Sequence, residues 1–355
     1  MIGGLPPGLM GSSPVLRPAL AVTACLSTVI GLSAGISFAS STIKISGSST
    51  VYPITQAAIK GFQSTSDGKN VQFALSETGS SAGLRQFCNG NIPLANASRP
   101  ISSKELKRCS NNGIHFIELP IAFDAITVVV NPANNWANSM TVGELSRLWN
   151  KQAQDKVNTW NQVNLDYPAS AIKLCGPGKQ SGTFDVFNKT INGSKKNSRT
   201  DYFASEDDND LVKCVASNKE ALAYFGYSYY KNNTSRLKAV KIVNSKGMPT
   251  SPSVKTVQNE KYQPLSRPLF LYVNDKQLRS NKAFRTFISY YLRNLAKLVK
   301  KSNYIPLPDS TYRLVDSKMY RHILGTSFGG DLPVGLTIGQ AIDRSFDQHK
   351  TKDHR

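Results

Sequence analysis

The chain has 355 residues, a formal net charge of +20 and five cysteines. A large positive charge steers anions toward a protein, but no helix-turn-helix, zinc-finger or RNA-stacking motif accompanies it, which excludes nucleic acid as the expected partner. We interpret the charge as a solvated basic surface, and we expect two lobes because the length exceeds what one hydrophobic core usually spans.

The N-terminal residues have the pattern of a secretory signal peptide. Arg17 precedes an apolar stretch over residues 18–36, and Ser37-Phe38-Ala39 is a small-x-small cleavage site. We therefore expect residues 1–39 to be removed and the protein to be periplasmic. Residues 22–25 also have the shape of a lipobox, which would leave a lipid anchor on Cys25. The apolar run continues past Cys25, and this favours plain cleavage.

Four cysteines remain after this cleavage. An exported protein meets an oxidising compartment, and an even number of cysteines is typical of disulfides. Four cysteines allow three pairings, and we expect Cys88–Cys109 and Cys175–Cys214 because each pair then lies within one chain segment. The sequence has no close Cys-x-x-Cys and its four histidines are scattered, so we predict neither a metal site nor a cofactor.

Strands and helices alternate along the first half of the mature chain. Apolar alternation predicts strands and helical periodicity predicts helices. The predicted elements are strands over 43–45 and 71–75, helices over 52–62, 84–88 and 141–149, and a long extended stretch over 116–131. This rhythm is typical of an α/β fold, in which ligands bind beyond the carboxyl ends of the strands.

The second half continues the same alternation. Ser205 precedes three acidic residues, which is a strong start signal for a helix. The predicted elements are strands over 171–174, 221–230 and 268–273, and helices over 184–191, 206–215 and 283–299. Residues 341–355 are expected to form a polar, frayed tail.

Three clusters of small hydroxyl residues and glycines each lie between a predicted strand and a predicted helix, at 47–50, 78–83 and 181–184. Helix N-termini expose unpaired N–H groups and the positive end of the dipole, and hydroxyls add donors. Three such ends meeting at one point would form a cage for a tetrahedral oxyanion. Arg99 would add charge, since its planar guanidinium suits an oxyanion. Taken alone, each cluster would equally fit a helix cap, and Arg99 a surface ion pair.

The second cluster also allows an enzymatic interpretation. Residues 79–83 read Gly-Ser-Ser-Ala-Gly, which matches the Gly-x-Ser-x-Gly elbow of serine hydrolases with Ser81 as nucleophile. His322 would have to serve as the base, but it has no loop signature around it. This alternative also leaves the other two clusters unexplained, so we predict a binding protein that is not an enzyme.

Six segments in a fixed order resemble the periplasmic phosphate-binding proteins of ABC phosphate importers. They are GSSTVYP at 47–53, GSSAG at 79–83, ANASRPI at 95–101, SGTF at 181–184, ASEDDN at 204–209 and PLSRPLF at 264–270. The resemblance covers nearly all of residues 43–340. It implies the two-lobed α/β fold of type II periplasmic binding proteins, with two crossing hinge strands and the ligand in the interdomain cleft.

The resemblance also implies domain boundaries and a ligand set. Lobe 1 would comprise 42–122 and 272–340, and lobe 2 would comprise 123–271, with crossings near 119–130 and 267–273. The phosphate-binding candidates from the resemblance and the clusters together are Ser49, Thr50, Ser80, Ser81, Arg99, Ser181, Gly182 and Thr183. The expected partners are inorganic phosphate and the membrane permease of an ABC importer, and the expected state is a monomer.

One position departs from the family pattern. Well-known members carry Asp after Ala-Ser, where this chain has Arg99. That aspartate accepts the proton of hydrogen phosphate and so disfavours fully ionised sulfate. Sulfate or another oxyanion therefore stays open as the ligand. The carboxylates that could replace the missing acceptor are Asp124, Asp185, Asp207 and Asp208.

Overall fold

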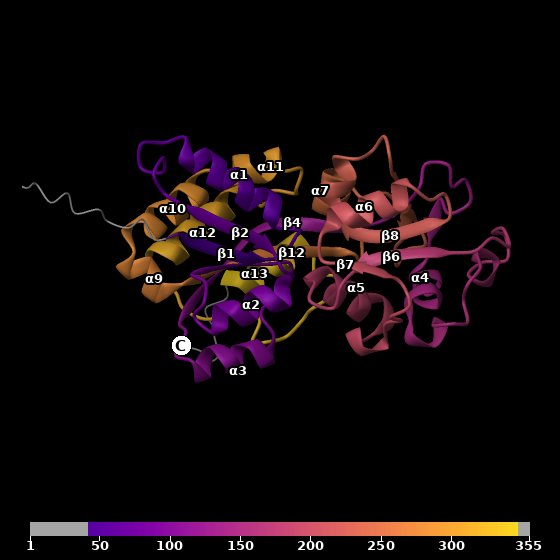
Figure 1. The fold of residues 1–355 in the computed structure, drawn as a ribbon, viewed down its shortest axis with the longest axis horizontal. Helices are drawn as coiled ribbons and strands as arrows, with labels where there is room; N and C mark the ends of the chain where they lie inside the picture. The colour runs from indigo at the N-terminus through magenta and orange to yellow at the C-terminus, as the bar shows by residue number, and fades with distance from the viewer. Residues whose placement is uncertain (1–41, 347–355) are drawn as a thin grey trace, which may run out of the picture. The chain divides into compact units, whose positions relative to one another are not determined.

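The computed structural model describes residues 42–346 (Figure 1). The expected signal peptide over 1–39, with Cys25, lies outside these residues, as do positions 347–355 of the expected tail. No helix between residues 42 and 346 combines the length and the apolar character needed to cross a membrane.

The N-terminal elements alternate strand and helix as expected. They are β1 (Ile43–Gly47), α1 (Tyr52–Gln63), β2 (Phe73–Glu77), α2 (Ser80–Cys88), β3 (Leu94–Ala97) and α3 (Ser103–Asn111). Helix α1 has Pro53 in its first turn, where the missing N–H costs nothing. Helix α3 begins with a capping box between Ser102 and Glu105.

Two long buried strands lie side by side and antiparallel in the middle of the sheet. They are β4 (Phe116–Val130) and β12 (Ser266–Asn274). Strand β4 pairs with β12 along its first part and with β8 along residues 126–130. Strand β12 also pairs with β3. These two strands therefore connect both ends of the sheet, which confirms the two expected crossings.

The middle of the chain supplies the other end of the sheet and its helices. Its elements are β5 (Ser139–Met140), α4 (Val142–Trp149), η1 (Lys151–Ala153), η2 (Trp160–Gln162), β6 (Lys173–Pro177), α5 (Gly182–Asn192), η3 (Lys195–Asn197), β7 (Phe203–Ser205), α6 (Asp208–Ala216), β8 (Ala221–Gly226), α7 (Tyr227–Lys231), β9 (Lys238–Ala239), β10 (Lys241–Val243), β11 (Pro249–Thr250) and α8 (Val254–Gln258). After β12 follow α9 (Asp275–Ser280), α10 (Lys282–Arg293), α11 (Leu295–Lys301), α12 (Asp309–Tyr320) and α13 (Ile338–Phe346).

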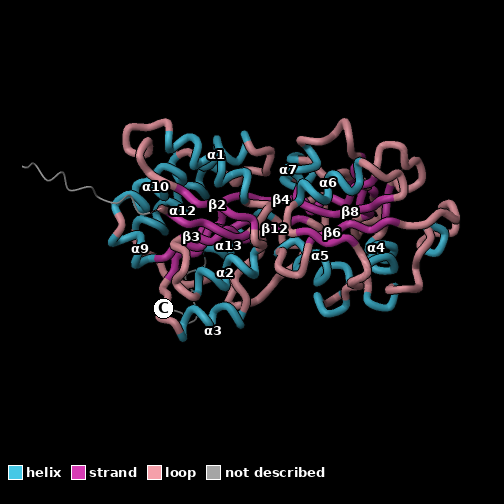
Figure 2. Tube along the Cα trace, viewed as in Figure 1, coloured by secondary structure: helices cyan, strands magenta, loops and turns pink. Residues whose placement is uncertain are grey.

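The main sheet has nine strands within the described residues, in the order β2-β1-β3-β12-β4-β8-β6-β7, with β9 added to β4. Strands run along the middle and helices lie on both sides of them (Figure 2). We call the end with β1–β3 lobe 1 and the end with β6–β8 lobe 2. Separate hydrophobic clusters fill the two ends. The fold is thus the two-lobed α/β architecture that the sequence predicts, while the residue boundaries of the lobes remain a prediction.

Three sequence predictions differ from the structure. The strand expected over 221–230 ends at Gly226 and helix α7 begins at Tyr227, because Asp124 Oδ1 accepts a hydrogen bond from the Tyr227 N–H at 2.9 Å. The helix expected over 283–299 is two helices, which meet at Asn294. Residues 341–346 are not frayed: they form the second part of α13, where Ala341 is buried.

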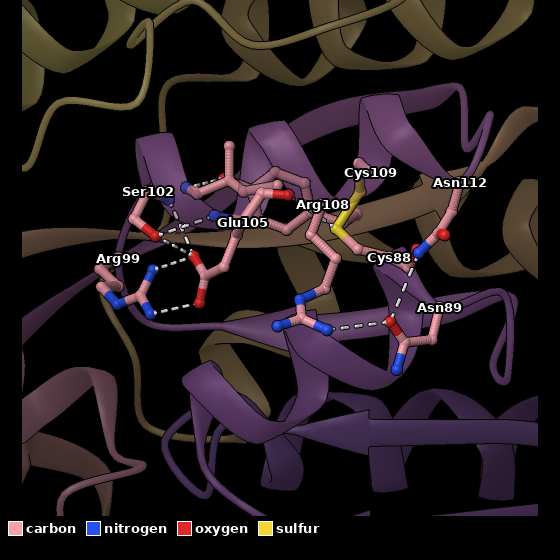
Figure 3. The surroundings of a disulfide bond; sticks show 10 residues. Cys88, Asn89, Arg99, Ser102, Glu105, Arg108, Cys109 and Asn112 are labelled. Carbon is pink, nitrogen blue, oxygen red and sulfur yellow. Dashed lines mark hydrogen bonds and ion pairs between the residues drawn. A yellow bond between two sulfur atoms is a disulfide. The ribbon is translucent and has the colours of Figure 1, made fainter.

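Both expected disulfides are present (Figure 3 shows the first). Cys88–Cys109 joins α2 to α3, and Cys175–Cys214 joins β6 to α6. The first fixes the helix that begins with Ser80, and the second fixes the strand that leads to Ser181. The first disulfide therefore anchors a helix that carries part of one hydroxyl cluster, and the second anchors the strand that precedes another.

Candidate functional site

The first and third hydroxyl clusters meet between the two lobes. Thr50 lies at the end of the β1–α1 loop, and Thr183 lies in the first turn of α5. Their hydroxyl oxygens are 3.3 Å apart although 133 residues separate them in sequence. Both side chains are fully buried. The alternation of strands and helices explains why the two clusters lie together, because each cluster follows the carboxyl end of a strand in its own lobe.

The second cluster reaches the same place through Ser80. Its hydroxyl accepts a hydrogen bond from the Ser98 N–H at 3.0 Å and lies 3.2 Å from the Ser98 hydroxyl. A Cβ on Gly182 would come within 2.5 Å of the Ser80 oxygen and 2.6 Å of the Ser98 oxygen. Gly182 is therefore what lets α5 of lobe 2 approach α2 of lobe 1 this closely.

Helix α5 points its N-terminus at this meeting point. Ser181 is the N-cap, and its hydroxyl accepts a hydrogen bond from the Thr183 N–H at 3.0 Å. Because the Ser181 oxygen only accepts in this cap, its O–H hydrogen can still be donated to a ligand. The N-terminal end of α5 also supplies the positive end of its dipole. Ser181, Gly182 and Thr183 thus combine hydroxyl donors with a favourable local field for an anion.

Arg267 on β12 links the two threonines. Its Nη2 donates to the Thr50 hydroxyl at 3.1 Å and to the Thr183 hydroxyl at 2.9 Å. The same nitrogen and Nε donate to Asp124 Oδ2 at 2.8 and 3.1 Å. Arg267 Nη1 has no hydrogen-bond partner among residues 42–346. The arrangement therefore holds a buried cation in place and leaves one end of its guanidinium free to donate.

Sequence reasoning missed Arg267, although its segment carries part of the family resemblance. The signal that could have revealed Arg267 is a charged residue in each of the two strands expected to cross. In the antiparallel pairing of β12 with β4, Arg267 stands directly opposite Asp124. Both residues lie in long apolar runs, where a charge is costly unless it is paired.

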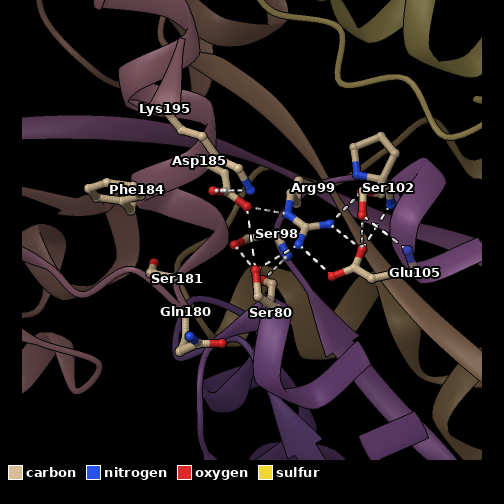
Figure 4. A network of polar contacts seen from close by, with 12 residues as sticks. Ser80, Ser98, Arg99, Ser102, Glu105, Gln180, Ser181, Phe184, Asp185 and Lys195 are labelled. Carbon is tan, nitrogen blue, oxygen red and sulfur yellow. Dashed lines mark hydrogen bonds and ion pairs between the residues drawn. The ribbon is translucent and has the colours of Figure 1, made fainter. Parts of the chain in front are cut away.

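Arg99 is placed differently from the sequence expectation of a direct anion contact (Figure 4). All five of its N–H donors are used by the protein. Nε donates to Asp185 at 2.7 Å, Nη1 to Glu105 and the Pro100 carbonyl at 2.8 and 2.9 Å, and Nη2 to Glu105 and Ser81 at 2.8 Å each. The Arg99 side chain is 2% exposed. Arg99 therefore has no donor left for a ligand in this arrangement.

The same contacts join the lobes. Arg99 and Glu105 belong to lobe 1, whereas Asp185 is in helix α5 of lobe 2. Burial lowers the pKa of Arg99, but Glu105 and Asp185 outweigh it and raise that pKa above its ordinary value. Burial raises the pKa of Glu105, and Arg99 more than reverses this, so the pKa of Glu105 is lowered. Both groups are consequently charged at neutral pH and attract each other strongly.

Ser81 lies in this network rather than beside a histidine. Its hydroxyl accepts from Arg99 Nη2 at 2.8 Å, and its N–H donates to the Gln180 carbonyl of lobe 2 at 2.8 Å. His322 instead contacts Asp275 at the start of α9. Within residues 42–346 no hydrogen bond joins Ser81 to His322, so the structure does not assemble the serine–histidine pair that a hydrolase needs.

The four candidate carboxylates have different environments. Asp124 and Asp185 are ion-paired, and Asp207 caps helix α6 by accepting from the Asn209 N–H at 2.8 Å. Asp208 is 1% exposed, and neither of its oxygens has a hydrogen-bond partner in the described part of the chain. Burial and the nearby Glu77 raise the pKa of Asp208, whereas Arg267, and the Gly226 N–H that approaches Asp208 without the geometry of a normal hydrogen bond, lower it by less.

Asp208 is therefore the one of the four that is buried and not already committed to a protein donor. Its neighbour Glu77 ends strand β2 in lobe 1, and burial with the repulsion of Asp207 raises the pKa of Glu77 to about 7. No group of three or more His, Cys, Asp or Glu side chains between residues 42 and 346 is arranged to hold a metal ion.

Comparison with known proteins places this geometry in a family. A family model described as the PBP superfamily domain matches residues 33–294. Protein SphX from Synechocystis sp. is 44% identical over 305 residues, which cover 86% of this chain and 90% of SphX. The phosphate-binding protein PstS from Staphylococcus saprophyticus is 33% identical over 78% of this chain and 84% of its own length.

A solved structure agrees with these relatives. The crystal structure of a possible phosphate binding protein from Planctomyces limnophilus has 39% sequence identity and a TM-score of 0.59, covering 79% of this chain and 98% of the solved chain. The family model and the relatives thus span most of the sequence, including all three hydroxyl clusters. The chain belongs to the PBP superfamily.

Proposed function

We propose that this protein captures inorganic phosphate between its two lobes and delivers it to the permease of an ABC importer. The observation that carries the proposal is Arg267, a buried cation whose Nη2 bridges hydroxyls of both lobes while its Nη1 has no hydrogen-bond partner in the described part of the chain. The relatives named phosphate-binding protein PstS and possible phosphate binding protein support phosphate as the anion. The protein acts as a binding protein, without enzymatic activity, after export to the periplasm, and as a monomer.

The ligand set combines donors from three elements. Hydroxyls of Thr50, Ser80, Ser181 and Thr183, with the backbone N–H of Gly182, replace the hydration shell of the anion. Arg267 supplies the charge that the sequence assigned to Arg99, and Ser49 remains a candidate in the β1–α1 loop. Because Ser81 bonds to Arg99 and Gln180, we assign it to closure of the lobes rather than to the ligand.

Arg99 acts as a positioning residue in this proposal. It joins Asp185 of helix α5 to Glu105 and Ser81 of lobe 1, and so it holds Ser181, Gly182 and Thr183 against the lobe 1 hydroxyls. Hinge closure around a ligand is typical of two-lobed binding proteins. Asp208 is the carboxyl assigned to exchange a proton with the ligand, because it is buried and has no hydrogen-bond partner among the described residues.

Calorimetric titration of the mature protein with phosphate and with sulfate tests the proposal, together with an assay for hydrolysis of an activated ester. We expect phosphate to bind in the micromolar range or tighter, sulfate to bind more weakly and the ester to remain intact. Ester hydrolysis that is lost in Ser81→Ala would establish the hydrolase instead. Tighter binding of sulfate than of phosphate would reassign the ligand while leaving the cage in place.

A further inference from the structure

Lobe 2 has a hollow that is separate from the site between the lobes. Its volume is about 500 Å³, and Lys151, Lys179, Lys195 and Lys196 line it together with Gln154 and Thr200. Among residues 42–346, no acidic side chain is part of the lining. We call this feature the lysine hollow. It is formed where η1, the loop before α5 and the residues after α5 come together.

The ammonium groups of the lysine hollow are largely uncompensated. Lys195 pairs with Asp185 at 3.2 Å (Figure 4). The other three lysines have no ion pair among residues 42–346. Like charges that share one hollow repel one another, and an anion placed among them removes that repulsion. The lysine hollow is therefore a concave surface with an excess of positive charge.

Neutral donors add to this field. Gln154 Oε1 accepts hydrogen bonds from the N–H and the hydroxyl of Thr200 at 3.1 and 3.2 Å. These bonds fix the side-chain amide, and its NH₂ group has no acceptor among the described residues. A fixed amide donor beside several ammonium groups suits an oxygen-rich anion, because each anionic oxygen accepts more than one hydrogen bond.

We propose that the lysine hollow is a second anion site, which binds a soluble compound carrying several phosphate groups, such as a short oligophosphate. A volume of about 500 Å³ lies in the range of pockets that hold ligands much larger than a single phosphate. Lysine binds phosphate groups as a point charge, so several separate lysines match several separate phosphates. The hollow is concave and bounded, whereas a nucleic acid requires an extended basic stripe.

The lysine hollow shares helix α5 with the site between the lobes. Phe184, which follows Thr183 in α5, also lines the hollow, and Lys195 contacts Asp185 of the same helix. One helix thus contributes to both sites. Because Lys195 pairs with Asp185 of the network around Arg99, a test of the hollow alone uses Lys151 and Lys196, which form no hydrogen bond or ion pair with the proposed phosphate ligands among residues 42–346.

The experiment is a calorimetric titration of the mature protein with tripolyphosphate, in the presence of orthophosphate that saturates the site between the lobes. The double variant Lys151→Gln/Lys196→Gln removes two charges of the hollow. The matched control Lys104→Gln/Lys107→Gln removes two exposed charges from α3, which lines no part of it. We expect tripolyphosphate to bind the wild type and the control alike, and to bind the hollow variant about tenfold more weakly.

Two results would overturn the proposal. One is the absence of tripolyphosphate binding by the wild type. The other is an equal loss of affinity in both double variants, which would mean that only the overall charge of the protein matters. Orthophosphate titrations of the same variants separate this proposal from the proposed function, since the affinity for orthophosphate should be unchanged by either pair of substitutions. Binding to anionic lipid vesicles without binding to tripolyphosphate would likewise reject a soluble ligand.

Discussion

Arg267 and Asp124 stand opposite each other on the two strands that cross between the lobes, and they form a buried ion pair with an Nη2–Oδ2 distance of 2.8 Å. Asp124 uses its second oxygen to begin helix α7 through the Tyr227 N–H. Arg267 uses the same Nη2 to hold Thr50 of lobe 1 and Thr183 of lobe 2. The pair thus places a single cation at the hinge where both lobes can contribute to one anion.

Replacement of Arg267 by Lys keeps the charge but loses the planar fork that reaches Asp124, Thr50 and Thr183 at once. We expect Arg267→Lys to weaken phosphate binding by about 100-fold, equivalent to about 2.7 kcal/mol. Calorimetry measures this loss. A second variant, Arg267→Met, leaves Asp124 buried without its partner and should lower the free energy of unfolding by about 3–5 kcal/mol. Full phosphate affinity in a folded Arg267→Lys variant would remove Arg267 from the ligand set.

Asp185→Asn tests the contact that joins the lobes. The change removes the charge that Arg99 meets in lobe 2, while Arg99 keeps Glu105 within lobe 1. We therefore expect the variant to fold and its closed form to be less stable, so that phosphate binds about tenfold more weakly. Small-angle scattering of the ligand-bound protein should show a larger radius of gyration than that of the wild type. An unchanged affinity would mean that this contact does not contribute to closure.

Gly182→Ala tests the close approach of α5 to α2. The added Cβ would lie 2.5 Å from the Ser80 hydroxyl oxygen, so the two lobes cannot reach the same distance. We expect at least a tenfold loss of phosphate affinity with a small change in the unfolding midpoint. The matched control is Gly143→Ala in α4, where the added Cβ would meet only the Thr141 hydroxyl oxygen, at 3.8 Å. The control should bind phosphate normally.

The raised pKa of Glu77 predicts that the free energy of unfolding depends on pH. The pKa of Glu77 is raised from its ordinary value of 4.5 to about 7, chiefly by burial. Between these two values the folded protein binds this proton and the unfolded chain releases it, so stability falls as pH rises through this window. Denaturant unfolding of the wild type and Glu77→Gln at pH 5 and pH 8 measures the effect. We expect Glu77→Gln to lose less stability between the two pH values than the wild type does.

The local features of this fold could be predicted from sequence. Each hydroxyl cluster is contiguous and follows an apolar strand, and each disulfide joins cysteines of one chain segment, so nearby residues carry the signal. The long apolar runs also predicted extended strands over 116–131 and 268–273, whereas their role as the two crossings was implied by the family resemblance. These predictions needed no knowledge of how the two lobes meet.

The partners of the charged residues could not be predicted in this way. Arg99 was expected to contact the ligand, but Glu105 and Asp185 occupy its donors, and Asp185 comes from the other lobe 86 residues away. At Tyr227, where helix α7 begins, the N–H donates to Asp124, which lies 103 residues earlier. Such contacts depend on strand register and on lobe contact, which a local pattern does not contain.

Asp208→Asn tests which group distinguishes phosphate from sulfate. Discrimination requires Asp208 to be ionised in the complex, where it accepts the proton of hydrogen phosphate and repels fully ionised sulfate; the amide always carries donors and would bind the two anions alike. We expect the ratio of phosphate to sulfate affinity to fall by about tenfold, measured by paired calorimetric titrations at pH 8. Because burial and Glu77 disfavour the ionised form of Asp208, the variant without ligand should also unfold at a higher denaturant concentration at that pH. Higher stability with an unchanged affinity ratio would mean that Asp208 is buried near the ligand without contacting it, and the discrimination would then have to come from the hydroxyl donors themselves.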